Sequence, residues 1–227
     1  MIRINRYISA SGFTSRRGAD QLIDEGRVKV NGSVLREKGL LIDPINDQVE
    51  IDDQSIVSDM SKAWIAFYKP RGVLSSMTGE KSLVQFIDSM PHKGLFHVGR
   101  LDRESEGLLV LTNDGDFAQN LIHPKYQVEK EYLVSLDTDI TKEFVSTLRG
   151  GLSLDDGPFK PLHVVKTGPN RVLLVISDGR NRVIRRAMAE LGFNVTRLLR
   201  TRVGKIELGP LREGEWRYLK KHEKTSQ

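Results

Sequence analysis

Residues 99–115, GRLDRESEGLLVLTNDG, contain a polar loop dense in charge, an apolar run and a turn signal. The apolar run at 108–111 predicts a buried strand, and the turn signal at 113–115 ends it. Loops held at the end of a buried strand commonly present catalytic groups. Asp102 lies in this loop between Arg100 and Arg103, and cationic neighbours favour an ionised carboxylate. The loop therefore suggests a nucleophile or general base at Asp102, with an ordinary surface cluster of ion pairs as the alternative.

Residues 178–192, DGRNRVIRRAMAELG, form a second element rich in basic residues. Val183, Ala187 and Leu191 recur at i, i+4 and i+8, which predicts a helix over 182–191 with one apolar stripe. The arginines of this helix lie on other faces, and at least one can point inward at the edge of the stripe. A guanidinium makes bidentate pairs with carboxylates and phosphates. We therefore expect one of these arginines to pair with the carboxylate of Asp102. A solvated helix face is the alternative.

Short apolar or alternating runs predict further strands around these two elements. The expected strands are 64–68, 108–111, 132–136, 172–176 and 195–199, and the expected helices are 117–122, 141–149 and 182–191. Strands outnumber helices and do not alternate regularly with them, which favours a mixed α+β sheet over a doubly wound α/β fold.

The beginning of the chain has the pattern helix–turn–helix–strand. Helical spacing covers residues 3–11, and Thr14 or Ser15 can cap a second helix. Polar and apolar residues then alternate up to the Asn31-Gly32 turn, which predicts a hairpin, and 49–51 predicts a closing strand.

Composition limits the class of protein. The 227 residues suggest one large and one small domain, and 38% hydrophobic residues suffice for a core. We expect no membrane-spanning segment, because no apolar stretch approaches the required ~18 residues, and no signal peptide. The absence of Cys excludes disulfides, a thiol nucleophile and Cys-based metal sites, and suits a cytoplasmic location.

The charges are distributed unevenly along the chain. Residues 1–36 contain 7 basic and 3 acidic groups, residues 37–170 contain 14 and 21, and residues 171–227 contain 14 and 6. Two basic ends around an acidic middle favour a polyanion, most simply a nucleic acid, over charge that serves solubility alone.

Common cofactor signatures are missing from the sequence. It contains no P-loop, no GxGxxG, no GxSxG elbow and no HExxH, and the five His residues lack metal-ligand spacing. We therefore expect no cofactor and no metal site.

Several motifs, in order, resemble one known family. Gly99-Arg100-Leu101-Asp102 and the residues up to Gly115 are similar to the catalytic motif of ribosomal pseudouridine synthases of the RsuA type. Further similar motifs are Lys130-Glu131-Tyr132, Gly179-Arg180-Asn181-Arg182 with Ile184-Arg185-Arg186, Arg197-Leu198-Leu199-Arg200 and Gly214-Glu215-Trp216-Arg217. The beginning of the chain resembles the S4 RNA-binding domain that this family carries there. The sequence differs from the family's usual residues at Ser105, Val183 and Ala187-Met188. We expect these differences to affect how the substrate is positioned and not the reaction itself.

The resemblance implies a fold and a reaction. It implies an α+β protein with a small S4-like α/β RNA-binding domain and linker at 1–58, and a larger mixed-sheet pseudouridine synthase domain at 59–227. The linker itself is expected over the polar residues 52–62. The implied reaction is isomerisation of a specific uridine in ribosomal RNA to pseudouridine, without a cofactor. Asp102 would be the essential carboxylate, Arg185 would pair with it, and Tyr132 would stack on the uracil.

The resemblance also implies the partner, which is ribosomal RNA or a ribosome assembly intermediate bound by a monomer. The basic residues expected to contact RNA are Arg3, Arg6, Arg16, Arg17, Arg27, Lys29, Arg100, Lys130, Arg180, Arg182, Arg186 and Arg200. The sequence leaves open which uridine and which ribosomal subunit are involved, and whether Asp102 attacks C1′ or removes the C2′ proton.

Two other functions stay open on the sequence. One is an RNA-binding or ribosome-assembly protein without catalytic activity. The other is a metal-dependent RNA-cleaving enzyme that uses Asp102, Asp114 and Asp116.

Overall fold

A computed structural model describes residues 1–58 and 61–225, which divide into two compact units. The first unit contains Met1–Ala63 together with Ser89–Phe96, and the second contains Trp64–Asp88 and His97–Gln227. The sequence-based division between residues 58 and 59 lies close to this one. Residues 59–60 of the expected linker lie outside the described residues.

The first unit pairs two helices with a small antiparallel sheet. Its elements are β1 (Ile2–Arg3), α1 (Ile4–Ala10), α2 (Arg16–Asp24), β2 (Val28–Val30), β3 (Ser33–Val34), β4 (Leu41–Ile42), β5 (Val49–Ile51) and β6 (Gln54–Ile56). The sheet has the order β3-β2-β5-β6, and β1 pairs with β4. The expected helix–turn–helix–strand order is confirmed. Ser15 is the cap of α2, because its Oγ accepts the Gly18 N–H at 3.1 Å.

The linker expected over residues 52–62 is wrong in its first part. Gln54–Ile56 forms strand β6, which pairs antiparallel with β5. Asp52 and Asp53 make the turn between them with φ of 50° and 63°, a conformation that Asp tolerates better than most residues. The polar composition of β6 concealed it, because this edge strand has exposed Gln54 and Ser55.

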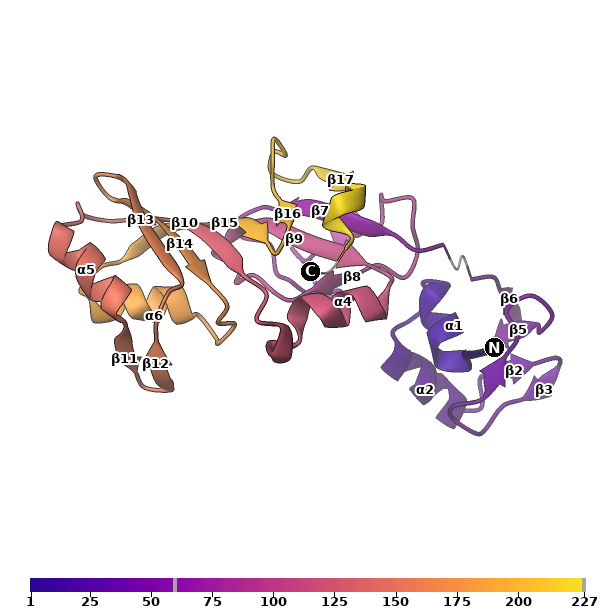
Figure 1. Ribbon diagram of the computed structural model, residues 1–227. Coiled ribbons are helices and arrows are strands. Elements are labelled where there is room, and N and C mark those ends of the chain that lie inside the picture. The colour runs from indigo at the N-terminus through magenta and orange to yellow at the C-terminus, as the bar shows by residue number, and fades with distance from the viewer. Residues whose placement is uncertain (59–60, 226–227) are drawn as a thin grey trace. The chain divides into compact units, whose positions relative to one another are not determined.

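The second unit is built around a large mixed sheet (Figure 1). Its elements are β7 (Trp64–Lys69), α3 (Val84–Ile87), β8 (Phe96–Val98), β9 (Glu106–Thr112), α4 (Gly115–Ile122), η1 (Pro124–Tyr126), β10 (Lys130–Leu136), α5 (Lys142–Gly150), β11 (Leu152–Leu154), β12 (Gly157–Phe159), β13 (His163–Gly168), β14 (Arg171–Ile176), α6 (Val183–Glu190), β15 (Val195–Val203), β16 (Ile206–Glu207), β17 (Trp216–Tyr218) and η2 (Lys221–Glu223). The sheet order is β13-β14-β10-β15-β9-β7-β17, and β9 and β15 are its parallel neighbours. All the strands and helices expected here are present, with shifted ends, and the α+β class is confirmed.

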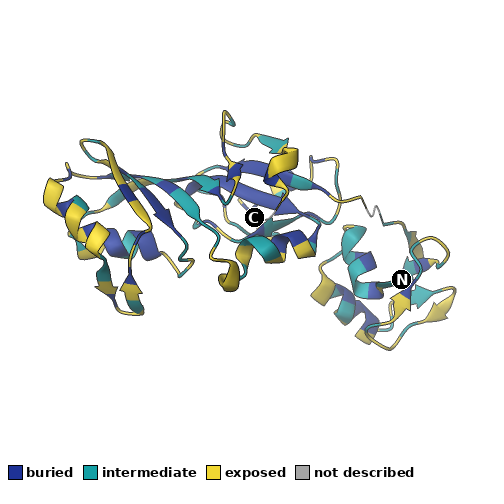
Figure 2. Cartoon of the chain, in the orientation of Figure 1, coloured by how far each residue is buried: buried dark blue, intermediate teal, exposed yellow. Residues whose placement is uncertain are grey.

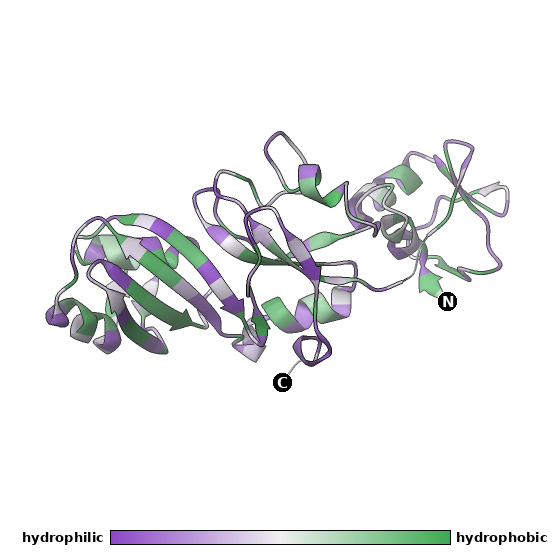
Figure 3. Cartoon of the chain, turned by 90° about the horizontal axis from the view of Figure 1, so that it is seen from above, coloured by the Kyte–Doolittle hydropathy of each residue, from purple (hydrophilic) through white to green (hydrophobic). Residues whose placement is uncertain are grey.

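Helices α5 and α6 share one hydrophobic core with the sheet. Tyr132, Val134 and Leu136 alternate along β10 and belong to this core, as do Phe144 of α5 and Met188 of α6. Since alternate strand residues face one side, both helices cover the same face of the sheet. Figure 2 shows the buried residues along the strands, and Figure 3 shows hydrophobic and hydrophilic residues in alternating bands. No helix of the described residues is long and apolar enough to cross a membrane.

Gly107 lets β9 approach β15 at the point where the Asp102 loop joins the sheet. Arg200 and Gly107 are register partners of the parallel pair. A Cβ on Gly107 would lie 2.4 Å from the main-chain oxygen of Arg200, and φ of this glycine is +100°. Only glycine fits both conditions, so this residue sets the loop directly beside β15.

Candidate active site

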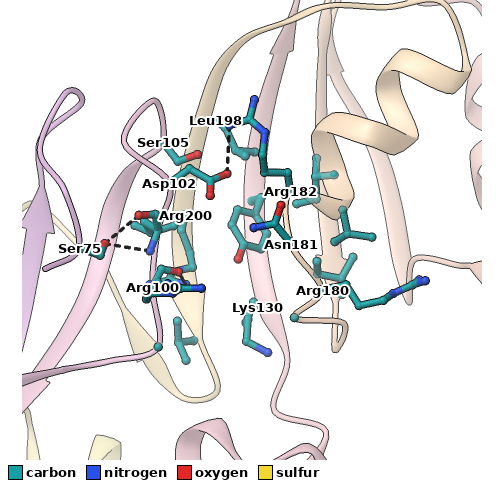
Figure 4. Close-up of a pocket in the computed structure, with 18 of the residues that line it drawn as sticks. Ser75, Arg100, Asp102, Ser105, Lys130, Arg180, Asn181, Arg182, Leu198 and Arg200 are labelled. Carbon is teal, nitrogen blue, oxygen red and sulfur yellow. Dashed lines mark hydrogen bonds and ion pairs between the residues drawn. The ribbon is translucent and has the colours of Figure 1, made fainter. Parts of the chain in front are cut away.

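A cavity of about 670 Å³ in the second unit gathers the two motif loops. Its walls come from residues 98–103, from 178–185, and from the loop at 74–76. Lys130 of β10 and Arg200 of β15 also line it (Figure 4). Tyr132 of β10 is a further lining residue. The volume falls in the range of small-molecule sites, so one nucleotide base can enter.

Asp102 lies in the wall of this cavity on a loop held by main-chain contacts. Its side chain is 31% exposed, and its carbonyl accepts the Ser105 N–H at 3.0 Å. Ser75, which the sequence analysis did not name, holds Leu101, the residue before Asp102. The Leu101 N–H donates to Ser75 Oγ at 3.0 Å, and this hydroxyl donates to the Leu101 carbonyl at 2.8 Å (Figure 4).

The arginine paired with Asp102 differs from the expected one. Nη1 of Arg182 lies 3.8 Å from Oδ2 of Asp102, and Nη2 lies 3.4 Å from Oε2 of Glu104. Arg185 instead donates to the carbonyls of Glu104 at 3.1 Å and of Val195 at 3.2 Å. The reason is that α6 begins after Arg182, which has a left-handed φ of 47°. The side chain of Arg182 therefore starts from the loop and not from a helix face.

Arg185 is nevertheless the inward-pointing arginine of α6. Its side chain is 11% exposed, and its Nε is buried without a hydrogen-bond partner in the described structure. Burial lowers the pKa of this guanidinium, the charge of Arg182 lowers it further, and Glu104 and Asp102 counteract both effects. Asp102 thus acts on Arg185 through its charge without forming an ion pair with it, and the carboxylate that Arg185 reaches is Glu104, at 4.0 Å.

Lys130 and Tyr132 line the cavity from β10. Tyr132 is 8% exposed and also belongs to the hydrophobic core. Nζ of Lys130 donates to the carbonyls of Val128 at 3.1 Å and Ser177 at 3.4 Å. Burial lowers the pKa of Lys130, and the charge of Arg200 lowers it further. Lys130 is therefore bound to main-chain oxygens and not displayed on the surface.

Arg200 is an internal brace. It is 4% exposed, and its Nε donates to the Leu108 carbonyl at 2.7 Å. Its Nη1 lies 3.4 Å from the Arg100 carbonyl. The buried guanidinium thus stabilises the two ends of the segment that contains Asp102. The sequence had predicted that Arg200 contacts RNA.

Arg180 and Arg186 are neutralised by carboxylates of the same chain. Arg186 makes a bidentate pair with Asp156 on the β11–β12 hairpin, at 2.8 and 2.7 Å. Arg180 pairs with Asp156 at 2.8 Å and with Asp178 at 2.7 Å. The hydrogen bonds from Arg186 lower the pKa of Asp156. This network ties the 178–182 loop to the hairpin.

The basic residues of the first unit fall into two groups. Arg27 pairs with Asp52 and Glu25, and Lys29 pairs with Asp53. The other group makes no ion pair with any residue in the described parts of the chain, and its members are Arg3, Arg6, Arg16 and Arg17. Of the residues expected to contact RNA in this unit, the second group therefore has charge that no carboxylate of the described residues neutralises.

Lys69 is a buried group that the sequence did not point out. It is 0% exposed, and its Nζ donates to the carbonyls of Pro70 and Val73 at 2.8 Å each. Burial lowers its pKa to about 8. The signal was present as a lysine that ends an apolar strand directly before Pro-Arg-Gly. Lys69 fixes the loop whose Gly72 N–H donates to the Arg103 carbonyl at 2.7 Å.

The acidic residues of the metal-dependent alternative do not form a ligand set. The carboxylate of Asp114 caps α4 and accepts the N–H groups of Asp116 and Phe117. Among the described residues, no three His, Cys, Asp or Glu side chains group as metal ligands. The geometry of these residues therefore favours a helix cap over a cation site.

Comparison with known proteins identifies the family. A family model described as RNA pseudouridylate synthase matches residues 63–190, and an S4 domain model matches residues 2–49. The ribosomal large subunit pseudouridine synthase B of Bacillus subtilis (strain 168) is 35% identical over 232 residues, which cover 98% of this chain and 94% of that protein. A Mycobacterium tuberculosis (strain H37Rv) protein named as an uncharacterised RNA pseudouridine synthase is 39% identical over 231 residues, with 98% and 91% covered. A crystal structure of a pseudouridylate synthase superposes with a TM-score of 0.71 at 28% identity, covering 100% of this chain and 99% of that one. The chain, with its S4 domain, belongs to the RNA pseudouridylate synthase family.

Proposed function

We propose that this protein converts a uridine of ribosomal RNA to pseudouridine, with Asp102 as the catalytic carboxylate. The observation that carries the proposal is the placement of Asp102 in a cavity that Tyr132 and Arg182 also line. The ribosomal target rests on the relative from B. subtilis, whose name specifies the large ribosomal subunit.

The reaction rearranges bonds within one nucleotide. The N1–C1′ bond breaks, the uracil turns, and C5 bonds to C1′. The hydrogen at C5 leaves as a proton, and N1 gains a proton, so no group is imported and nothing is oxidised. A carboxylate at Asp102 can add to C1′ or take the C2′ proton, and each route needs it unprotonated. The balance of the reaction calls for no cofactor.

The target base has to leave its stack to reach Asp102. Such flipping costs a few kcal/mol, which contacts elsewhere on the RNA offset. Tyr132 supplies an aromatic ring for stacking. Its ring position is fixed because it belongs to the core under α6.

The first unit grips the structured RNA. Arg3, Arg6, Arg16 and Arg17 make no ion pair with any residue in the described parts of the chain, and charges of this kind are available for phosphates. The enzyme acts as a cytoplasmic monomer on naked ribosomal RNA or on an assembly intermediate.

Pseudouridine mapping tests this function. Ribosomal RNA from a strain that lacks the gene should lose pseudouridine at one site or a few neighbouring sites, detected by carbodiimide modification and primer extension. A plasmid copy of the gene should restore them. An unchanged pseudouridine pattern in both ribosomal subunits would contradict the proposed substrate.

A further inference from the structure

The arginines around the cavity differ in whether a carboxylate of the protein neutralises them. On the side of α6, Arg180 and Arg186 pair with Asp156, and Arg182 pairs with Asp102 and Glu104. A phosphate that binds these groups must first displace a carboxylate, and each displacement costs part of the binding free energy.

Three exposed arginines on the 71–76 and 99–105 loops have no such partner. Arg71, Arg100 and Arg103 are exposed, and no carboxylate lies within ion-pair distance of them in the described parts of the chain. Arg71 donates through Nη1 to the Thr196 carbonyl at 3.1 Å, and Arg103 through Nε to the Gly72 carbonyl at 3.2 Å. A neutral carbonyl orients a guanidinium and leaves its full positive charge.

The two loops that carry these arginines are fixed to each other. The Gly72 N–H donates to the Arg103 carbonyl at 2.7 Å, while Ser75 Oγ holds Leu101 through two hydrogen bonds. Buried Lys69 anchors the first loop at its base. The main chain of both loops is therefore already ordered before a ligand binds, which lowers the entropy cost of binding.

This cationic rim, defined as Arg71, Arg100 and Arg103, adjoins the site of chemistry. Arg100 and Arg103 line the same cavity as Asp102. Arg71 binds the carbonyl of Thr196, and the neighbouring carbonyl of Val195 accepts a hydrogen bond from Arg185 in the cavity wall. A ligand on the rim is thus adjacent to whatever occupies the cavity.

We propose that the cationic rim binds the backbone phosphates next to the target uridine, so that the RNA strand enters over the 71–76 and 99–105 loops and not over α6. The inference rests on the proposed function, because it names the surface that serves this same site. It assigns Arg71 and Arg103, which the sequence had not placed among the RNA contacts, as RNA-binding residues, and it removes Arg180 and Arg186 from the expected phosphate contacts.

The test compares charge removal with charge retention in the full-length protein. We expect R71Q/R103Q to bind in vitro transcribed large-subunit ribosomal RNA more weakly. The slope of log affinity against log[KCl] should flatten by about 0.7–0.9 for each phosphate that the variant no longer neutralises. R71K/R103K should keep most of the slope, since counterion release depends on charge. R171Q is the matched control, because exposed Arg171 lies at the start of β14 and the cavity contacts Ile176 at its end.

Several outcomes would overturn the proposal. They are an unchanged slope in R71Q/R103Q, an equal change in R171Q, or an equal loss in R71K/R103K. Thermal unfolding of each variant shows whether a loss of RNA affinity comes from misfolding. If the double variant is misfolded, the salt slopes of the single variants R71Q and R103Q decide whether the rim binds phosphates. A flattened slope without pseudouridine formation by the wild type would refute the proposed function and keep the rim. Pseudouridine formation by the wild type together with an unchanged slope in R71Q/R103Q would support the proposed function and refute the rim.

Discussion

Asp102 has two arginine neighbours that act on it differently. Arg182 is 44% exposed and pairs directly with Asp102 at 3.8 Å. A partly exposed pair at this distance contributes at most about 1 kcal/mol. Arg185 is 11% exposed and holds the carbonyl of Glu104, two residues beyond Asp102. Arg185 therefore stabilises the conformation of the Asp102 loop, whereas Arg182 mainly places a positive charge beside the Asp102 carboxylate.

We expect R185Q to lower kcat by about 100-fold and R182Q by about tenfold or less, where each tenfold corresponds to about 1.4 kcal/mol. R185Q leaves two main-chain acceptors without their donor, so the Asp102 loop shifts. R182K keeps a charge near Asp102 and should recover most of the loss in R182Q. Single-turnover kinetics on saturating RNA measure both. A larger loss in R182Q than in R185Q would contradict this ranking.

For single residues, the sequence indicated which side chains line the cavity better than which partners they contact. Asp102 stood out because two arginines flank it in a loop before a buried strand. The partner of Arg186 could not be predicted, because Asp156 lies 30 residues away on a hairpin that brings it back. The exchange of Arg185 for Arg182 follows from one left-handed residue at the start of α6.

Among the elements, η2 is attached to the sheet by one buried carboxylate. Glu223 is 5% exposed and accepts both Nη atoms of Arg217 on β17 at 2.7 Å. It also accepts the N–H of Lys220 at 2.7 Å. Burial alone would raise the pKa of Glu223, but these hydrogen bonds outweigh it and lower the pKa to about 2.

We expect E223Q to destabilise the second unit by about 3 kcal/mol at pH 7, the low end for a broken buried pair because Arg217 is partly exposed. The folded-state pKa lies below the reference value of 4.5. The stabilisation is therefore complete above about pH 4.5 and is lost as the pH falls toward 2. Urea unfolding followed by tryptophan fluorescence reports this unit, since the 2 Trp residues are Trp64 and Trp216. The difference between wild type and E223Q should shrink below pH 4.5, and a difference independent of pH would contradict the role of Glu223.

In the second unit the sequence predicted the strands with clear apolar or alternating patterns and missed the six-residue β13 and several shorter strands. β9 and β10 each have seven residues with clear apolar or alternating patterns. β8, β11, β12 and β17 have three residues each, too few for a period to be recognised. Such strands exist because a neighbour offers hydrogen-bonding groups, as β7 does for β17. β6 was missed because its residues Gln54 and Ser55 are polar and exposed.

For the whole molecule, the unpaired arginines of the first unit predict how RNA binding depends on salt. The full-length variant R3Q/R6Q/R16Q/R17Q should bind ribosomal RNA more weakly, with a salt slope flatter by about 0.7–0.9 for each phosphate left without its arginine. Turnover at saturating RNA should change much less than affinity. R27Q/K29Q is the control, because Asp52 and Asp53 already pair with these residues. An equal effect of both variants would refute the distinction between free and paired charges.

Chain length and the resemblance to the S4 domain, not the charges, led to the expectation of one small and one large domain. The basic beginning is the S4 domain, matched over residues 2–49. The sequence did not predict that Ser89–Phe96 belongs to the first unit. This membership depends on tertiary contacts between segments that are distant in the chain.

Tritium release from RNA tests the central claim most directly. RNA labelled with tritium at C5 of uridine loses the label to water when C5 bonds to C1′. The account predicts that D102N keeps the affinity and salt slope of the wild type and releases no tritium above background, a fall of at least about 1,000-fold. D139N, which changes an exposed aspartate of the same unit, should release tritium at the wild-type rate. Turnover by D102N within about tenfold of the wild type would contradict the assignment of Asp102 as the catalytic carboxylate.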